Sequence, residues 1–390
     1  MNQEKYVFTQ LVEFLNNDKF RRLVDKYDGN RYVKHFTCWN QLLAMMFGQF
    51  SNRESLRDLI VAIEAHQGKR YHLGLGRKPI AKTTLATANQ TRDFRIFEDF
   101  AFYMMKEARE KRTSNILDIP GKKYAFDSTT IPLCLATFPW AKFRRNKGGV
   151  KAHVLYDVEA QVPAFYTVTA ASKHDSTEMS AIHCEPNAYY IFDRAYDSFK
   201  ELYKIHLTDS YYIIRAKTNL KYKVVKWKRR MPRNILTDAE VKLTGFLSEK
   251  KYPESFRLIR FYDEEDKREF TFLTNAKHIT AIDIANLYKK RWLVELFFKW
   301  LKQHLKIKRF WGTTENAVRI QISVAIITYC QVTVIQHDMQ LSRSTYEVLQ
   351  ILSISLTDKT HLRDLFDKTN FNEVKEQFDP LIPGVVYLII

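Results

Sequence analysis

The sequence predicts an α/β protein with a helical N-terminal region, and three successive patterns carry this prediction. Apolar residues recur at helical spacing before residue 115, and short apolar runs rich in β-branched residues follow from about residue 123. Helical spacing returns after residue 280. Because strands with helices between and after them form layered structures, we expect a mixed sheet covered by helices. The 390 residues are enough for two or three domains.

The N-terminal region is predicted to form several short helices. Ser51 and Glu54 have the spacing of a capping box, in which two side chains satisfy free amides at a helix start. Thr83 or Thr84 could cap a later helix, and Phe94–Arg109 indicates another. Short helices joined by basic turns favour a helix-turn-helix-like module that binds DNA. The alternative is a plain helical bundle that only packs on the next domain.

From Lys123 onward the pattern changes to strands. Each expected strand is a short apolar run, and turns or polar segments separate one run from the next. The expected strands are Tyr124–Ile131, Val150–Val158, Val162–Thr169, Ala188–Asp193 and Tyr211–Arg215.

A basic, β-rich insertion is expected to interrupt this domain. Lys217–Arg233 is rich in lysine and arginine and contains no acid, and the strand-like runs Phe256–Tyr262 and Glu269–Thr274 follow. Trp227 lies among Lys226, Lys228, Arg229 and Arg230. An aromatic side chain in a cationic strip can stack on an unpaired or flipped base. The alternative is that Trp227 packs within the insertion.

Two aspartates stand at or near the ends of predicted strands. Asp127 and Asp193 would protrude from the edge of the sheet, where α/β domains tend to bind ligands. A lone aspartate after a strand is usually a turn former or a helix cap. On that basis Asp157, Asp175 and Asp197 are competing candidates.

The surroundings of Glu295 favour Asp127 and Asp193 over the three competing aspartates. It is the single acid between Tyr288 and Arg309, in a segment rich in lysine and arginine. We expect one long helix or a helix pair over Ile284–Lys308. The basic residues of the segment are Lys289, Lys290, Arg291, Lys299, Lys302, Lys306, Lys308 and Arg309.

One face of this helix is expected to carry Tyr288, Arg291, Glu295 and Lys302, because they follow one another at spacings of three, four and seven residues. A carboxylate among phosphate-binding cations suits metal-assisted phosphodiester chemistry. The alternative is a core helix in which the glutamate pairs with Lys299. The expected apolar face comprises Leu293, Leu296, Phe297, Trp300 and Leu301.

The charge balance favours a polyanionic partner. Lysine and arginine total 62 against 44 aspartate and glutamate, which gives a formal net charge of +18. A soluble protein this basic usually binds nucleic acid, with an anionic membrane surface as the second choice. The alternative is that the net charge only aids solubility.

Cysteine usage and hydropathy indicate a cytoplasmic protein. Four widely separated cysteines form no CxxC pair, which argues against a zinc knuckle and a disulfide framework. Met1–Asn16 contains acids and no long apolar run, so we expect no signal peptide. Ile320–Ile335 includes two glutamines and is shorter than about 20 residues, which predicts a buried helix rather than a membrane span.

These motifs together resemble the insertion-sequence transposases of the DDE class, in the branch with the signature Y-x2-R-x3-E-x6-K. Tyr288, Arg291, Glu295 and Lys302 match that signature completely. The resemblance spans about residues 120–350. The first two acidic motifs of the class correspond to Phe126-Asp127-Ser128-Thr129 and Ile191-Phe192-Asp193-Arg194-Ala195-Tyr196.

The resemblance implies a ribonuclease H-like fold with a mixed five-stranded sheet and a β-rich insertion between the second aspartate and the glutamate. The gap between Asp193 and Glu295 is too long for one crossover, which independently indicates an insertion. Asp127, Asp193 and Glu295 would hold two Mg²⁺ (or Mn²⁺) ions. The implied activity is cleavage at transposon ends and joining to target DNA, by phosphodiester hydrolysis and transesterification.

The implied partners are double-stranded DNA with terminal inverted repeats, target DNA and a second copy of the chain in a DNA-bound synaptic complex, without a membrane. In a bacterial cytoplasm the bound protein would be associated with the nucleoid. Arg291 and Lys302 would contact phosphates, with Tyr288 beside them. Further expected DNA contacts are Lys299, Trp227 and Arg194.

The alternatives in function are a DNA-binding repressor without catalysis and a ribonuclease H-like nuclease that cuts without strand transfer.

Five segments follow from these patterns. The segments are a helical, DNA-end-binding region 1–115, the first part of the catalytic domain 120–216, the insertion 217–278, the second part of the catalytic domain 279–340, and a C-terminal helical tail 341–390.

Overall fold

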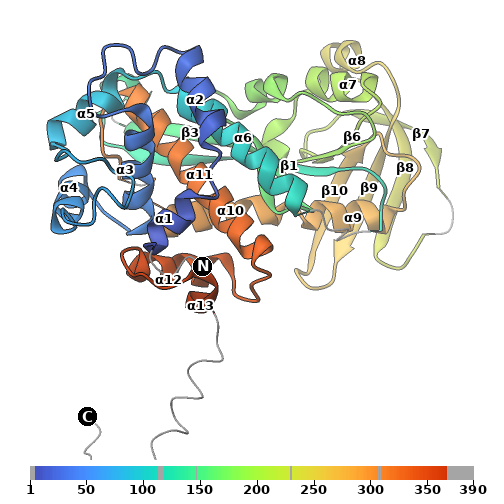
Figure 1. The fold of residues 1–390 in the computed structure, drawn as a ribbon. Helices are drawn as coiled ribbons and strands as arrows, with labels where there is room; N and C mark the ends of the chain where they lie inside the picture. The colour runs from blue at the N-terminus through green and yellow to red at the C-terminus, as the bar shows by residue number, and fades with distance from the viewer. Residues whose placement is uncertain are drawn as a thin grey trace, which may run out of the picture.

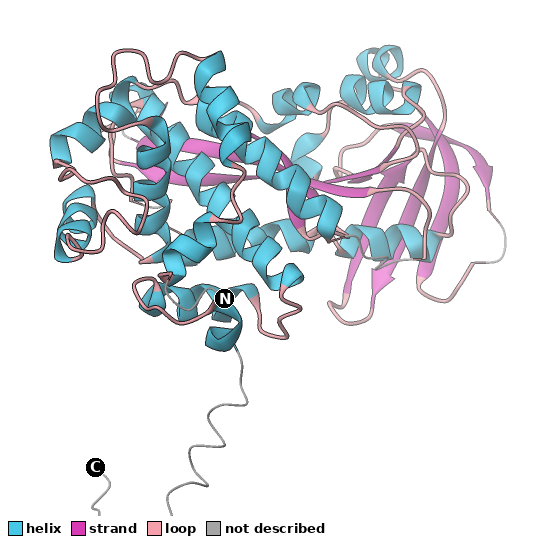
Figure 2. Ribbon diagram, in the orientation of Figure 1, coloured by secondary structure: helices cyan, strands magenta, loops and turns pink. Residues whose placement is uncertain are grey.

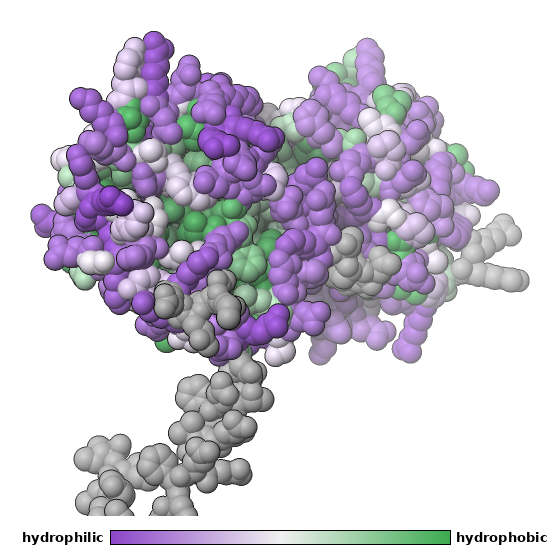
Figure 3. Space-filling view, in the orientation of Figure 1, coloured by the Kyte–Doolittle hydropathy of each residue, from purple (hydrophilic) through white to green (hydrophobic). Residues whose placement is uncertain are grey.

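The computed structural model describes residues 5–112, 118–145, 147–228, 231–305, 307 and 309–366. Helices gather around one half of a long sheet, and the strands of the insertion stand at the opposite end of the molecule (Figures 1 and 2). On the face in Figure 3 hydrophilic side chains predominate over both ends, and hydrophobic side chains gather mainly near the middle. The predicted α/β class is confirmed.

The N-terminal region is helical, as predicted. Its helices do not form a separate bundle, because α3 and α6 pack on a helix from the C-terminal half of the chain, α11 (Glu315–Asp338). The helices are α1 (Val7–Val12), α2 (Asn17–Lys26), α3 (Cys38–Phe50), α4 (Leu56–Ala65), α5 (Lys82–Thr91) and α6 (Arg95–Lys111).

Two predicted helix caps are wrong. Ser51 follows α3 instead of preceding a helix, and its hydroxyl donates to the Phe47 carbonyl oxygen. The cap of α4 is Ser55, whose side chain accepts from the Asp58 amide. The predicted box failed because α3 continues to Phe50, which leaves Ser51 in a C-terminal position. Neither Thr83 nor Thr84 caps α5, since Ala81 occupies the N-cap position.

The first part of the sheet has the five-strand arrangement of a ribonuclease H-like fold. In the order β4-β3-β1-β5-β6, the neighbours of β3 are antiparallel to it, and β5 lies parallel to both β1 and β6. The 3-10 helices η1 (Pro139–Ala141), η2 (Asp175–Ala181) and η3 (Arg194–Tyr196) and helix α7 (Phe199–Leu207) connect the strands. The strands are β1 (Lys123–Leu133), β2 (Lys142–Arg144), β3 (Lys147–Asp157), β4 (Val162–Ala170), β5 (Tyr189–Phe192) and β6 (Tyr211–Arg215).

The insertion is β-rich, as expected, and it extends the central sheet. Strand β10 pairs antiparallel with β6, so the sheet continues through β9 and β8 to β7 and reaches ten strands. Pairing with β10 covers the backbone groups that β6 would otherwise leave as an open edge. The elements of the insertion are β7 (Tyr222–Trp227), β8 (Ile235–Leu243), α8 (Phe246–Lys251), β9 (Phe256–Asp263) and β10 (Arg268–Thr274).

The predicted basic helix is a pair, α9 (Ala281–Lys289) and α10 (Trp292–His304). Thr280 caps α9 in a capping box with Asp283, so the helix begins at Ala281, three residues before the expected Ile284. The expected apolar face of α10 is partly wrong, because Leu296 is 43% exposed. Nearly every residue in this stretch is apolar, so periodicity did not fix the buried face. The buried residues of α10 are Val294, Phe297, Phe298 and Leu301.

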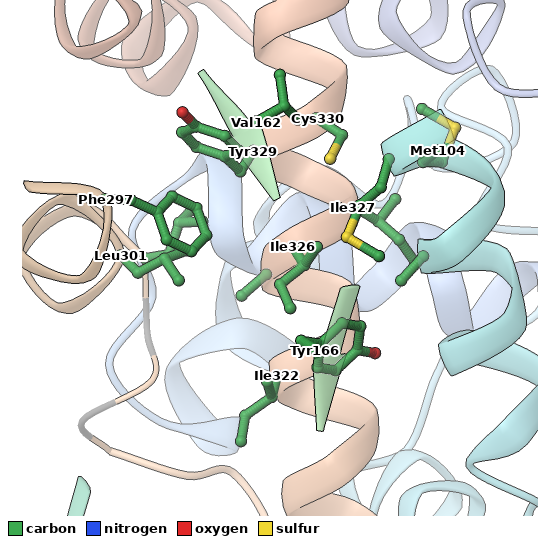
Figure 4. Close-up of a cluster of buried hydrophobic side chains, with 14 of the residues drawn as sticks. Met104, Val162, Tyr166, Phe297, Leu301, Ile322, Ile326, Ile327, Tyr329 and Cys330 are labelled. Atoms are coloured by element: carbon green, nitrogen blue, oxygen red, sulfur yellow. The ribbon is translucent and has the colours of Figure 1, made fainter. Parts of the chain in front are cut away.

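Helix α11 forms the centre of the core. Figure 4 shows its side chains between those of α6, β4 and α10, with Ile326 and Ile327 facing Met104 and Phe297. Among the described residues α11 is the one helix long and apolar enough to cross a membrane, and 94% of its apolar window is buried inside the protein. The predicted buried helix is therefore confirmed. After it come α12 (Thr345–Ser355) and α13 (Leu362–Phe366), while the predicted tail beyond residue 366 lies outside the described residues.

Truncating a side chain of α11 tests this core. Ile326→Ala should lower the free energy of unfolding by about 2–5 kcal/mol, because it leaves a cavity where Ile326 is 1% exposed. Ile354→Ala on α12 is the matched control, since Ile354 is 82% exposed. Urea denaturation followed by fluorescence measures both variants. Equal destabilisation by the two substitutions would contradict the central position of α11.

Candidate active site

Asp127 and Asp193 lie side by side because the strands that carry them are parallel neighbours. Phe126 of β1 pairs in register with Phe192 of β5, so the two aspartates follow at the same level of the sheet. Asp193 follows β5 directly and is the N-cap residue of η3. The expected strand end is therefore right for Asp193 and wrong for Asp127, because β1 continues beyond Asp127 to Leu133. The two aspartates nevertheless lie at the same level of neighbouring strands, as expected.

Helices α9 and α10 bring the rest of the signature to the two aspartates. The Tyr288 hydroxyl donates to Oδ1 of Asp193 at 3.3 Å. Arg291, between the two helices, donates from Nη1 to Oδ2 of Asp127 at 2.7 Å and from Nη2 to Oε1 of Glu295 at 2.6 Å. One guanidinium therefore joins the first and third predicted carboxylates.

Burial shapes the protonation of this cluster. The Asp127 side chain is 18% exposed, and its burial, together with the charges of Glu295 and Asp193, raises its pKa to about 6. The Arg291 guanidinium and the Ser128 amide oppose this rise. Burial also raises the pKa of Tyr288 to about 12, so its hydroxyl keeps the proton that it donates to Asp193.

The three carboxylates fit a divalent cation by their chemistry. Carboxylate oxygens are the ligands that Mg²⁺ and Mn²⁺ prefer. A positive group, the Arg291 guanidinium, already bridges Asp127 and Glu295, which shows that this position accepts a cation. Within the described residues, no three histidine, cysteine, aspartate or glutamate side chains are grouped closely enough to hold a metal as they stand. The carboxylates would have to exchange the guanidinium for the ion.

The competing aspartates have other partners. Asp157 accepts from the amides of Glu159 and Ala160, as a turn former does. Asp197 forms an ion pair with Lys217 at 3.2 Å.

Asp175 stabilises β1 next to Asp127 through contacts with two side chains. It accepts a 2.8 Å hydrogen bond from the Ser128 hydroxyl and pairs with Lys151 at 3.0 Å. Ser128 follows Asp127 directly, so this pair holds the strand next to the first carboxylate. The sequence alone did not assign this function to Asp175 or Lys151.

The other expected DNA contacts are spread over a wider surface. Lys302 donates to the Thr130 carbonyl oxygen at 3.1 Å, on the strand that carries Asp127. Lys299 and Arg194 are exposed, on α10 and just after Asp193. Lys306, Lys308, Arg229 and Arg230 lie outside the described residues.

Trp227 is not part of the carboxylate cluster. It is 61% exposed on β7, at the far edge of the sheet. Five strand steps separate β7 from β5, which corresponds to roughly 24 Å at the usual strand spacing.

A cavity of about 430 Å³ opens between the cluster and the insertion. Asp193, Tyr288 and Arg291 line one side of it, and Arg215 and Arg268 line another. Both of these arginines lie over the ring of Phe270, at 5.1 and 4.5 Å from its centroid. Acids also line the cavity, namely Asp263, Glu265 and Asp266, so cations and carboxylates are mixed beside the second aspartate.

A ribonuclease H-like sheet with three acidic side chains at one edge defines a class of enzymes that act on phosphodiester bonds with divalent metal. The family model described as Transposase DDE domain matches residues 120–331. The chain belongs to this family of DDE transposases, metal-dependent enzymes that cut and join DNA. A second model, Domain of unknown function (DUF4372), matches residues 3–76.

Two relatives in sequence are named as transposases. "Putative transposase y4zB" of Sinorhizobium fredii is 31% identical over 299 residues, which cover 75% of this chain and 80% of that protein. "Probable transposase for insertion sequence element IS5377" of Geobacillus stearothermophilus is 31% identical over 227 residues, or 56% of this chain and 58% of that protein. A solved piggyBac transposase synaptic complex with hairpin DNA aligns with a TM-score of 0.47 at 12% identity, over 96% of this chain and 86% of that chain.

Removal of the bridging guanidinium tests the electrostatics of the cluster. Arg291→Ala should lower the free energy of unfolding without metal by about 1–3 kcal/mol, because it leaves partly buried carboxylates unpaired. Millimolar Mg²⁺ should then raise the melting temperature of the variant more than that of the wild type. Arg194→Ala, at an exposed position, is the control. An equal response of all three proteins to Mg²⁺ would refute the exchange of guanidinium for metal.

Proposed function

We propose that this chain cuts DNA at the ends of its own insertion sequence and joins those ends to target DNA, with Asp127, Asp193 and Glu295 as the metal ligands. The observation that carries this proposal is the Arg291 bridge, which brings the third acid of the signature to the sheet edge where the other two acids lie. The alternatives, a nuclease without strand transfer and a repressor without catalysis, have no separate observation in their favour.

The three carboxylates would hold two Mg²⁺ or Mn²⁺ ions. Bound there, the ions would supply an activated water or 3′-hydroxyl and stabilise the leaving oxygen. Asp127 and Asp193 are fixed by their strands, and Glu295 by α10, so the chain contributes chiefly positioning and charge.

Arg291, Tyr288 and Lys302 would act around the scissile phosphate. Once metal occupies the carboxylates, the Arg291 guanidinium is free to contact a phosphate oxygen. Tyr288 keeps Asp193 oriented through its hydroxyl. Lys302 donates to the carbonyl oxygen of Thr130, which is three residues after Asp127 on β1. From this position it can reach the phosphate next to the scissile one.

The proposed partners are double-stranded DNA with terminal inverted repeats, target DNA and a second copy of the chain in the synaptic complex. The net charge of +18 supports a polyanionic partner. Lys299 and Arg194 are exposed next to the cluster and would extend the contact with the DNA backbone. Trp227 would stack on an unpaired or flipped base well away from the scissile phosphate.

Isosteric replacement of the acids tests the metal ligands. Asp127→Asn, Asp193→Asn and Glu295→Gln should each reduce Mg²⁺-dependent cleavage by about 10³-fold or more, because each removes a ligand charge. DNA binding should persist in all three. Asp197→Asn is the matched control, since Asp197 pairs with Lys217 instead. Cleavage near the wild-type rate would remove the corresponding residue from the site.

The products of the same reaction distinguish the alternatives. Transfer of pre-cut ends into a plasmid is expected from the wild type. Cleavage without transfer would favour the nuclease, and DNA binding without either activity would favour the repressor.

Lys302→Ala should weaken binding of a DNA end and flatten its salt dependence by about one unit of slope, since one phosphate contact is lost. Lys200→Ala, an exposed lysine on α7, should leave the slope unchanged. A salt titration by fluorescence anisotropy measures both. Identical slopes for the two variants would place Lys302 outside the interface.

A further inference from the structure

A long groove crosses the helical N-terminal region, apart from the catalytic carboxylates. Its larger section has a volume of about 820 Å³ and lies between residues 27–36, residues 78–79 and α5. A smaller section of about 290 Å³ adjoins it around residues 75–80. The two sections share lining residues, including His35, Lys78 and Thr84, so they form one continuous depression. We call it the α5 groove.

Positive charge in the α5 groove is largely uncompensated. Arg31, Lys34, Arg77 and Lys78 are exposed along it, and within the described part of the chain none of them forms an ion pair with a carboxylate. Other exposed cations of the same region do find acids, as Lys26 does with Asp99 at 2.9 Å. The groove cations are thus available to an external anion.

The acids of the groove do not balance these cations. The carboxylate of Asp93 is occupied by Arg95, which donates to both of its oxygens. Asp28 is the remaining acid among the described lining residues. A further cation, Arg92, is held at the groove wall by the Gln41 side chain and the Phe36 carbonyl oxygen. The net charge of the groove is therefore positive.

Three of these cations contact neutral or aromatic neighbours. The Arg31 guanidinium lies 5.0 Å from the ring centroid of Tyr32, and the Arg77 guanidinium lies 4.7 Å from that of Tyr71. Both rings are exposed, Tyr32 to 88% and Tyr71 to 56%. Lys78 Nζ is 2.9 Å from Nε2 of His35. These neighbours carry no carboxylate, so they leave the positive charge of the three cations uncompensated.

Helix α5 lines the groove with hydroxyl groups. Thr83, Thr87 and Thr91 follow one another at helical spacing and are exposed, whereas Leu85 and Asn89 are buried. The Thr91 hydroxyl donates to the Thr87 carbonyl oxygen at 2.9 Å. The first turn of α5 carries neither an acid nor a side-chain cap. The surface of α5 therefore offers the Thr83 and Thr87 hydroxyls without negative charge.

Buried contacts anchor α5 to the core. Asn316 of α11 donates to the carbonyl oxygens of Asn89 and Arg92 at 2.9 and 2.6 Å. Gln41 of α3 donates to the Asn89 side chain at 2.8 Å. A surface fixed in this way can position a large partner relative to the catalytic sheet.

We propose that the α5 groove binds the sugar-phosphate backbone of duplex DNA. Exposed cations without a carboxylate partner, together with threonine hydroxyls, are groups that contact DNA phosphates. The proposal rests on the proposed function, in which the partner is a transposon end.

The position of the groove indicates which part of the DNA it contacts. Helix α5 lies at one end of the molecule, and β7–β10 lie at the other (Figure 1). None of the three carboxylates lines the α5 groove, so DNA there would be contacted apart from the scissile phosphate. This assigns a function to part of the region that matches a domain of unknown function.

A triple substitution tests the proposal on the full chain. Arg31→Ala, Lys34→Ala and Lys78→Ala combined should weaken binding of a mixed-sequence DNA duplex at least about 10-fold and flatten the salt dependence by about two to three units. Arg21→Ala, Arg57→Ala and Lys359→Ala combined form the control, with three exposed cations outside the groove. The combined substitutions Arg31→Lys, Lys34→Arg and Lys78→Arg keep the positive charges and should therefore retain most of the affinity. Equal melting temperatures verify folding.

Three outcomes would overturn the proposal. They are an unchanged affinity and salt slope in the groove variant, an equal loss in the control variant, and equal competition by a single strand of the same length. Metal-dependent nicking at saturating protein should persist in the groove variant. If nicking persists while the slope does not change, the groove assignment fails and the proposed function stands. If the wild-type protein neither binds nor nicks DNA, the proposed function fails.

Discussion

Negative charge crowded at one sheet edge is the constraint on which this structure depends. The parallel pairing of β1 with β5 sets Asp127 beside Asp193, and α10 adds Glu295 across the Arg291 guanidinium. Burial first, and then the charges of Glu295 and Asp193, raises the pKa of Asp127, because an unneutralised carboxylate is unfavourable at this site. A positive group is therefore required in every state of the site. Arg291 supplies it without metal, and divalent ions would supply it during catalysis.

The sequence predicted the parts of the site that local patterns encode. Apolar runs located β1 and β5, and the isolated acid in a basic helical segment identified Glu295. The contacts between these parts were not predictable. The sequence left one long helix or a helix pair open for residues 284–308, and the structure has a pair, with Arg291 between the two helices directed toward two carboxylates. Such long-range pairing has no local signal.

The same distinction applies to the fold. Strands β9 and β10 alternate or contain β-branched and aromatic residues, and they were predicted. Strand β7 was missed because its side chains are mostly exposed and carry no alternating pattern. The continuity of the sheet from β6 into β10 depends on pairing between distant segments. The N-terminal caps were wrong for a simpler reason, since Ser51 and Ser55 are both plausible caps and only the end of α3 at Phe50 decides between them.

The long sheet ends at β7, an edge strand with unpaired backbone groups on its outer side. Open edges of this kind invite pairing with a second chain and aggregation. Lys223 and Lys226 are exposed along this strand, and Lys228 follows it directly. Two copies that approached edge to edge would bring these lysines together and repel each other. The lysines of β7 would therefore oppose edge-to-edge pairing of two copies of the chain.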